Sequence, residues 1–486
     1  MSSLIERIEK SKVFWFLLFT SFIFFLLRLP SLFEPYWYGD EGIYQVIGTV
    51  LRRGGEMYVN AWDNKPPLLF VIYYLFDGDQ QIIRAISLIF GILTTIFYFL
   101  LAKKIVGEKI SFVITSLFVL YLSTPVLEGN IANTENFMLL PITIAGFLFT
   151  RFIQEDNKKF LFTAGLLLGI AFLFKIVAAF DALAFLFFLL YIVSLKDLDR
   201  KSIFPKLRNA FIFGIVFLIP IFLVSIYFFL DNNLHNYSRA VLLENFSYVN
   251  YKNQFFIPQG LLIIKLIIIS VALLITYVHR LSFKKEYLFV LIWFLFSVFN
   301  VFFSHRPYIH YLLLLIPSFF LMLGIILKEK NIRVKFLIIL FSTLVILLSY
   351  FDLYPKNALY YKNFLDFLSN RKDVNAYRSF FDRNTPRDYE IALYIKENTN
   401  EEDNIFIWGN NPQAYKLAGK TPPGTYSVIY HITSYEDGLK NTKDYLDKKN
   451  PKLIVIMPND RAYPFSLAEY SHKIDIMGAQ IYEKTN

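Results

Sequence analysis

The sequence contains no cysteine. Without thiols the chain cannot form disulfides, ligate a metal through thiolates or use a cysteine as a nucleophile. The absence of cysteine says little about the compartment of this protein.

Motifs for soluble nucleotide cofactors are also lacking. The one Gly-Lys-Thr, at 419–421, has Ala414 where a phosphate-binding loop needs its first glycine. There is no His-Glu-x-x-His helix motif and no Gly-x-Gly-x-x-Gly turn. The motifs therefore give no support to chemistry that depends on a nucleotide or on zinc.

What the sequence has instead is apolar surface. Hydrophobic residues make up 56% and aromatic residues 19% of the 486, and the mean hydropathy is +0.45. A soluble core of this size cannot bury so much, so the chain needs lipid as its solvent. We expect a polytopic α-helical membrane protein.

Apolar runs long enough to cross a bilayer recur along the chain, and we count about eleven. Their expected bounds are 13–29, 82–102, 110–127, 136–153, 160–175, 178–195, 208–230, 259–279, 286–303, 308–327 and 334–351. The first run is not followed by a small-residue cleavage site, so we interpret it as a retained span.

Basic residues divide the connections between these runs into two classes. If the N-terminus is cytoplasmic, the Lys and Arg clusters fall on the inner side, as the positive-inside rule requires. An odd number of spans then places residues after 351 outside the cytoplasmic (inner) membrane. The net charge of +10 reflects this topology and attraction to membrane lipids, and no nucleic-acid-binding module is present.

Three polar regions interrupt the apolar runs: residues 30–81, residues 231–258 and the tail from 352. We expect a transmembrane domain over 1–351, with interfacial helices in 30–81, and an extracytoplasmic α/β domain over 352–486. In the tail, 404–409 and 452–457 are predicted strands and 389–398 a helix. All three regions are predicted to lie outside, where an enzyme cannot easily rely on cytosolic ATP or sugar nucleotides. Any donor would therefore have to be presented in the membrane.

The first polar loop (residues 30–81) carries two adjacent carboxylates, Asp40 and Glu41, among Trp37, Tyr38 and Tyr44. Desolvation beside a low-dielectric boundary would raise a carboxylate pKa toward the range of a general base. The alternative is an interfacial loop with ordinary solvated acids.

Further along this loop, Lys65 precedes Pro66 and Pro67 and a short apolar run through Phe76. Prolines suit the first turn of a helix, which is the ordinary interpretation. A lysine beside the positive end of a helix dipole would also favour a phosphate.

Three later segments complete a recognisable series: 131–136, which contains Glu135; 169–175, which ends at Lys175; and 306–317, which begins Arg-Pro-Tyr-Ile-His-Tyr. Together with Asp40-Glu41 and Lys65-Pro66-Pro67, this order resembles the bacterial protein O-mannosyltransferases and the lipid A aminoarabinose transferase, a glycosyltransferase family 39-like group. The resemblance covers most of the chain and implies the GT-C fold.

The resemblance also implies an inverting transfer from a polyprenyl-phosphate-linked sugar to a glycan, lipid or protein acceptor. It assigns the catalytic carboxylates, with Asp40 as base and Glu41 and Glu135 as orienting groups. It assigns donor-phosphate binding to Lys65, Lys175 and Arg306, cations that would stabilise the leaving phosphate. Further candidates are Tyr44, His305, His310 and Tyr311.

Each assignment has an ordinary alternative. Glu135 could serve only the helix dipole, Lys175 could snorkel to the interface, and the basic residues of 305–310 could anchor it. Lys265 lies inside another predicted span and matches no motif of the family. A single lysine within an apolar run is therefore weak evidence for a functional site.

No metal ligands are assigned. Where aminoarabinose relatives carry Glu before Lys-Pro, this chain has Asn64, with Asp63 one residue earlier. The use of a divalent cation therefore stays open. Two rival functions also stay open, a lipid-linked-sugar flippase or transporter and a non-catalytic subunit that binds lipid phosphate.

Overall fold

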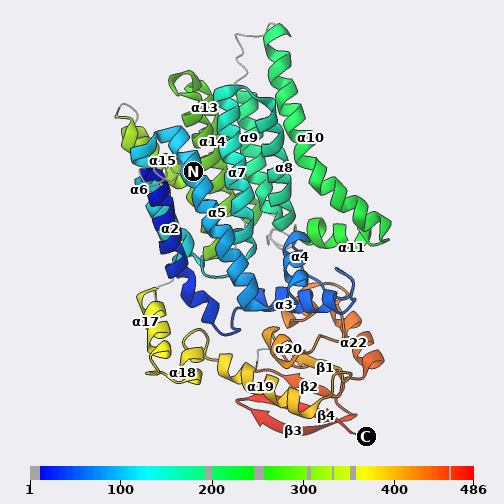
Figure 1. Cartoon of the computed structure of the whole chain (residues 1–486). Helices are drawn as coiled ribbons and strands as arrows, with labels where there is room; N and C mark the ends of the chain where they lie inside the picture. Colours follow the sequence, from blue (N-terminus) through cyan, green and yellow to red (C-terminus); the bar gives the residue numbers. More distant parts are fainter. Residues whose placement is uncertain are drawn as a thin grey trace, which may run out of the picture. The chain divides into compact units, whose positions relative to one another are not determined.

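The structure is a computed structural model that describes residues 11–191, 200–245, 257–303, 308–330, 333–350, 357–458 and 461–485 (Figure 1). The chain forms two compact units. Unit 1 comprises Met1–Leu29, Ile86–Leu234 and Val241–Asn357, and unit 2 comprises Pro30–Ala85, His235–Ala240 and Ala358–Asn486.

Unit 1 is a bundle of apolar helices. They are α2 (Lys12–Arg28), α5 (Gln80–Val106, which begins in unit 2), α6 (Glu108–Ser123), α7 (Thr134–Glu155), α8 (Lys158–Phe174), α9 (Ala179–Tyr191), α10 (Arg200–Leu230), α13 (Ile257–Val278), α14 (Lys285–Phe303), α15 (Ile316–Lys328) and α16 (Arg333–Tyr350). Each predicted span overlaps one of these helices, although 308–327 also includes the 3-10 turn that precedes α15. Residues 192–195 and 351, at the ends of two predicted spans, lie outside the described residues. Short 3-10 turns lie at Leu29–Phe33, Pro125–Leu127, Ile176–Ala178, Arg280–Ser282 and Ile309–Leu314.

Five of the described helices are long and apolar enough to cross a membrane by length and composition: Lys12–Phe33, Gln80–Val106, Thr134–Glu155, Leu207–Leu230 and Lys285–Phe303. Shorter apolar helices accompany them at Ile176–Leu190, Leu262–Val278, Ile316–Lys328 and Leu337–Leu348. The number of membrane crossings stays a prediction, while the multi-pass helical class is confirmed.

Two kinds of helix occur in this bundle. In Figure 1, α7, α8, α9 and α14 run side by side, and α7 packs on α8 and α9 on α14. Glycines permit close approach, since a Cβ at Gly165 of α8 would lie 3.2 Å from the backbone oxygen of Phe213 in α10. By contrast, α10 exposes Phe211, Leu218 and Phe222, an apolar surface that suits contact with lipid.

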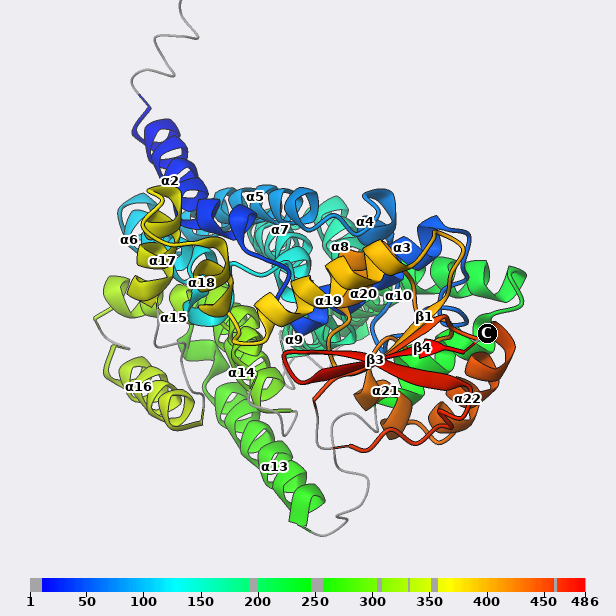
Figure 2. The same cartoon turned by 90° about the horizontal axis from the view of Figure 1, so that it is seen from below.

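Unit 2 contains a four-stranded sheet in the tail. The strands are β1 (Ile405–Trp408), β2 (Leu453–Ile456), β3 (Tyr470–Ile476) and β4 (Ala479–Lys484), in the order β1-β2-β4-β3. The pair β1–β2 is parallel, with Ile405 opposite Leu453, and the other two pairs are antiparallel. The helices α20 (Gln413–Ala418), α21 (Ile429–Ser434) and α22 (Gly438–Lys449) make the crossover, and α19 (Thr385–Asn398) lies beside the sheet (Figure 2).

The predicted strands at 404–409 and 452–457 are confirmed, and so is the helix at 389–398. The hairpin of β3 and β4 was not predicted. Most residues of β3 are exposed on both faces, so the strand lacks the apolar alternation by which strands are recognised.

Unit 2 also includes the first polar loop, which differs from the predicted boundary after residue 351. In the loop, α3 (Gly39–Arg52) and α4 (Leu68–Leu75) pack on each other, and α3 packs on α20 of the tail. The buried side chains of Ile43, Val46 and Ile47 give α3 an apolar face, and the tail helps to cover it.

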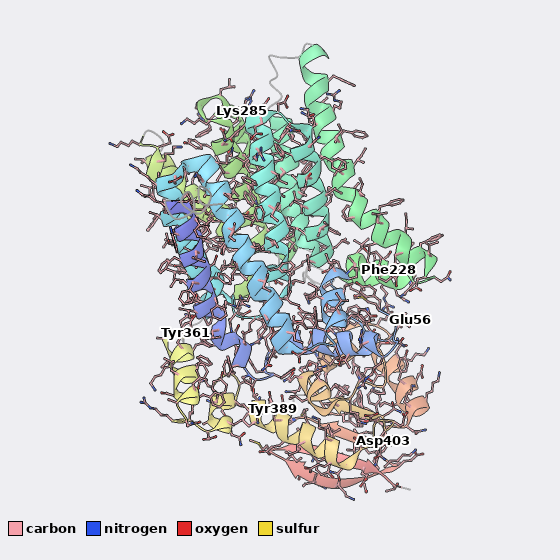
Figure 3. All side chains as sticks on the ribbon, in the orientation of Figure 1. Glu56, Phe228, Lys285, Tyr361, Tyr389 and Asp403 are labelled. Atoms are coloured by element: carbon pink, nitrogen blue, oxygen red, sulfur yellow. The ribbon has the colours of Figure 1, made fainter. Side chains whose placement is uncertain are left out.

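Hydrogen bonds reinforce this packing. Arg53 Nη2 donates to the Gly419 oxygen at 2.8 Å and Thr425 Oγ1 to the Val59 oxygen at 2.7 Å. Tyr389 on α19, labelled in Figure 3, accepts from the Tyr36 backbone N–H at 3.0 Å. Unit 2 also includes residues 235–240, which lie in α11 (Leu234–Ser238) and in a π-helical turn at Arg239–Leu243. Most of α17 (Asn357–Leu368) and all of α18 (Val374–Ser379) belong to the same unit.

Candidate active site

The first turn of α3 carries Asp40 and Glu41, where the positive end of the helix dipole favours carboxylates. Asp40 is half-buried, and one helical turn later the Tyr44 hydroxyl donates to Asp40 Oδ2 at 3.4 Å. Asp40 therefore combines partial access to solvent with a polar partner fixed by helix geometry.

The ammonium group of Lys65 lies over the ring of Tyr44. Its Nζ is 5.0 Å from the centroid of Tyr44 and 3.2 Å from Asp63 Oδ1. The Tyr58 hydroxyl donates to the Lys65 backbone oxygen at 2.8 Å and fixes the loop that carries the lysine. The structure thus brings together Asp40, Tyr44 and Lys65, all predicted from the sequence, around one aromatic ring.

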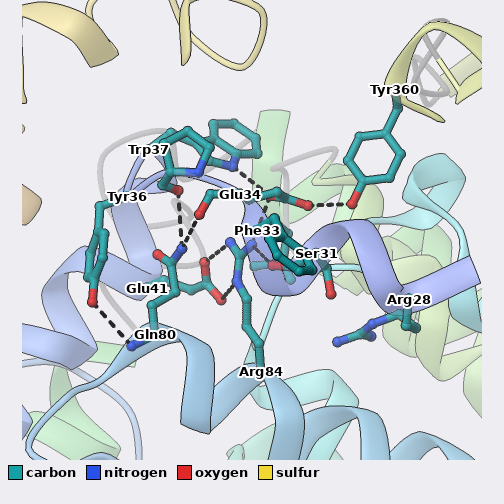
Figure 4. Close-up of polar contacts among 12 residues, drawn as sticks. Arg28, Ser31, Phe33, Glu34, Tyr36, Trp37, Glu41, Gln80, Arg84 and Tyr360 are labelled. Atoms are coloured by element: carbon teal, nitrogen blue, oxygen red, sulfur yellow. Dashed lines mark hydrogen bonds and ion pairs between the residues drawn. The ribbon is translucent and has the colours of Figure 1, made fainter. Parts of the chain in front are cut away.

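Glu41 has a different environment from Asp40. Its side chain is 1% exposed, and Arg84 Nε donates to Glu41 Oε1 at 3.0 Å. Arg84 Nη1 also lies 2.9 Å from Glu34 Oε2, and Tyr360 donates to Glu34 at 2.6 Å (Figure 4). Arg84 therefore ties two buried carboxylates together, which leaves Asp40 as the better placed base.

An aromatic cluster lies in the same unit, and the sequence analysis did not identify it. Trp62 contacts Tyr435 at 4.2 Å, His431 at 5.1 Å and Tyr426 at 5.9 Å between ring centroids. Burial is the main cause that lowers the pKa of His431 to about 3, the Lys65 charge adds to the effect and Asp40 opposes it. The imidazole is accordingly neutral near pH 7.

Unit 1 holds a second charged group. Lys175, at the C-terminal end of α8, pairs with the buried Glu135 of α7 and lies 4.5 Å from the ring centroid of Tyr311. His310 Nε2 is 3.9 Å from Glu135 Oε1, and its Nδ1 is 2.8 Å from Glu128 Oε2. The structure therefore joins four residues predicted from separate segments: Glu135, Lys175, His310 and Tyr311.

Glu128 was missed because it follows no family motif. Its backbone is left-handed, at φ 56°, directly after the 3-10 turn at Pro125–Leu127. Lys265 donates to the Phe302 backbone oxygen, in keeping with a structural role. His305 and Arg306 lie outside the described residues.

Among the residues that the structure describes, no three His, Asp or Glu side chains are grouped so that they could hold a metal ion. Directly before the Lys-Pro pair, the residue is Asn64, which has no carboxylate, and Asp63 is paired with Lys65. We therefore derive no step through a metal.

Comparison with known proteins bears on the fold and the family. Residues 65–227 match the family of dolichyl-phosphate-mannose-protein mannosyltransferases. ArnT from Cupriavidus metallidurans bound to undecaprenyl phosphate superposes with a TM-score of 0.60 at 15% identity, over 97% of this chain and 98% of that one.

The protein has the GT-C fold.

Other structures with this fold are similar too. The apo form of the same ArnT has a TM-score of 0.56 at 13% identity, over 97% and 98% of the two chains. The apo oligosaccharyltransferase of Archaeoglobus fulgidus has 0.50 at 12% identity, over 92% of this chain and 69% of that one. No curated protein matches the sequence.

The GT-C fold and the family match confirm the resemblance predicted from the motifs. They indicate a glycosyltransferase that uses a sugar linked to a lipid phosphate. At these identities the structural likeness extends to the fold only, so the residues of this GT-C protein must be argued from their own surroundings.

Proposed function

We propose that this GT-C protein is an inverting glycosyltransferase that moves a sugar from a polyprenyl-phosphate donor to an acceptor at the outer face of the cytoplasmic membrane. The observation that carries the proposal is that Asp40 and Lys65 both contact Tyr44. The Asp40 carboxylate accepts a hydrogen bond from the Tyr44 hydroxyl, and the Lys65 ammonium lies over the Tyr44 ring. The carboxylate can accept the proton of an attacking nucleophile, and the ammonium can stabilise the charge of a departing phosphate.

In the proposed reaction, Asp40 accepts the proton of an acceptor nucleophile as that group attacks the anomeric carbon. The bond from that carbon to the phosphate oxygen breaks, and polyprenyl phosphate leaves with its negative charge. A base that acts in the transition state contributes about 10² to 10⁴ in rate. Lys65 lies in the same unit and stabilises the charge on the phosphate.

The other candidates take supporting roles. Glu41 holds Arg84 and so fixes the first turn of α3 that presents Asp40. In unit 1, Lys175 is the proposed lipid-phosphate ligand, and Glu135 and His310 orient it. A phosphate that reaches Lys175 would compete with Glu135 for the ammonium.

The test is turnover in proteoliposomes. Purified protein is given a panel of polyprenyl-phosphate sugars with candidate acceptors, and released polyprenyl phosphate is measured for wild type and Asp40→Asn. We expect release with at least one donor and a fall of about 100-fold or more in the variant.

Asp447→Asn, at an exposed aspartate on α22 of the same unit, is the matched control and should keep wild-type turnover. Lipid-linked sugar that crosses the bilayer without bond cleavage would instead identify a flippase. Binding of the lipid phosphate without release under any condition would indicate a non-catalytic subunit.

A further inference from the structure

The aromatic cluster of Trp62, Tyr426, His431 and Tyr435 is built from two distant parts of the chain within unit 2. Trp62 comes from the first polar loop, three residues before Lys65, and the other rings come from the tail. Trp62 contacts all three of these partners, and Tyr426 stacks on Tyr435 at 5.8 Å with an interplanar angle of 20°. The tail thereby contributes to the neighbourhood of the candidate lysine.

His431 is the polar member of this cluster. It is 5% exposed, and within the described part of the chain its buried Nδ1 has no hydrogen-bond partner. An unsatisfied buried polar atom destabilises the folded state, a cost that a phenylalanine would avoid. Nδ1 is therefore available to bind a ligand, as far as the described residues show.

Trp62 of the cluster precedes Lys65 by three residues, and the charges of Lys65 and Asp40 both act on the pKa of His431. A neutral imidazole cannot pair with a phosphate as a cation does, but it can exchange hydrogen bonds with a hydroxyl. The ring of Tyr430, 39% exposed, lies 4.3 Å from that of His431, and Tyr435 is half-buried. These two tyrosines form the outer cover of the histidine.

We propose that the aromatic cluster is the acceptor subsite and that the acceptor is a carbohydrate, whose sugar ring packs on Trp62 and Tyr435 while one hydroxyl hydrogen-bonds to His431 Nδ1. This inference rests on the proposed transferase activity and names its acceptor class. Aromatic walls with few polar groups and no net charge suit an uncharged ring with an apolar face and several hydroxyls. Tyr430 is the exposed ring of the outer cover, and its displacement would open a path to the histidine.

The experiment compares His431→Phe, which keeps a ring and removes Nδ1, with His431→Asn, which keeps a polar atom near the Nδ1 position. Each is reconstituted with the donor identified for wild type, and initial rates are measured against methyl glycosides and against a serine- and threonine-containing peptide. His472→Phe is the matched control, because His472 lies on β3 of the same unit and is exposed.

We expect wild type to use a glycoside, and His431→Phe to raise the KM for that glycoside about tenfold, the worth of one hydrogen bond. The donor KM and kcat should stay near wild type, His431→Asn should recover most of the loss, and His472→Phe should change nothing. An unchanged glycoside KM in a more heat-stable His431→Phe would overturn the inference and identify a packed core. Use of the peptide but of no glycoside would also overturn it.

Two further readouts separate this inference from the proposed function. If His431→Phe does not fold, Tyr435→Ala at the half-buried edge of the cluster must show the same rise in glycoside KM. If wild type releases no polyprenyl phosphate, the proposed function fails. Glycoside binding, followed by tryptophan fluorescence, then decides the subsite: saturable binding that His431→Phe weakens supports it, and no binding refutes it.

Discussion

Arg84 shows how much one residue can organise at the residue scale. Its guanidinium faces Glu34 and Glu41 and also donates to the Ser31 backbone oxygen at 2.7 Å, with all three side chains nearly inaccessible. The guanidinium of arginine is planar, always charged and carries five N–H donors, so it can bind two carboxylates and a backbone oxygen together, which a lysine ammonium would not do as well.

Replacing Arg84 by methionine should destabilise unit 2 by about 3–5 kcal/mol, because two buried carboxylates lose their counter-charge. The measurement is the thermal unfolding midpoint in detergent. Lys362→Met is the control, since Lys362 pairs with Asp366 on the surface and is 67% exposed. Equal midpoints for Arg84→Met and wild type would contradict the prediction.

Residue-level prediction from the sequence was uneven for a physical reason. Asp40 and Tyr44 are one helical turn apart, so their contact follows from local geometry. Arg84 was not predicted as a functional or structural residue, because it lies inside the apolar run at 82–102. His431 could not be linked to Trp62, because more than half of the chain lies between these two residues and only the fold brings them together.

At the scale of elements, membrane thickness makes helices predictable. Long apolar runs can satisfy their backbone in lipid only as helices, so composition and length sufficed for unit 1. Unit 2 has no such constraint. There the predicted strands were those with continuous buried apolar residues, β1 and β2, whereas the exposed β3 gave no signal.

The packing of α3 on α4 depends on Gly48. A Cβ added there would lie 2.6 Å from the Tyr73 backbone oxygen and 2.7 Å from its carbonyl carbon, and backbone atoms cannot yield as a flexible side chain does. We expect Gly48→Ala to lower stability by about 1–3 kcal/mol, measured by thermal unfolding.

Gly39 provides the comparison, because a Cβ at this position in the same helix meets nothing within 4 Å. Gly39→Ala should unfold at the wild-type temperature. Similar midpoints for the two alanine variants would show that α3 and α4 are not held as closely as described.

At the scale of the whole molecule, the absence of cysteine allows the predicted topology to be tested without background. Ser466→Cys lies in the exposed part of the tail, and Ser282→Cys lies between two predicted spans on the predicted inner side. In intact cells a membrane-impermeant maleimide should label Ser466→Cys, and should label Ser282→Cys only after permeabilisation. The opposite order would place the tail in the cytoplasm.

Unit 2 is assembled from Pro30–Ala85, His235–Ala240 and Ala358–Asn486. During synthesis the first polar loop leaves the ribosome long before the tail, and contacts of such sequence separation form late. Until then the apolar face of α3 lacks the cover of α20, and Arg53 lacks the Gly419 oxygen. The helix that carries Asp40 therefore gains this cover only after α20 has been synthesised, so we expect the proposed catalytic base to become ordered late in folding.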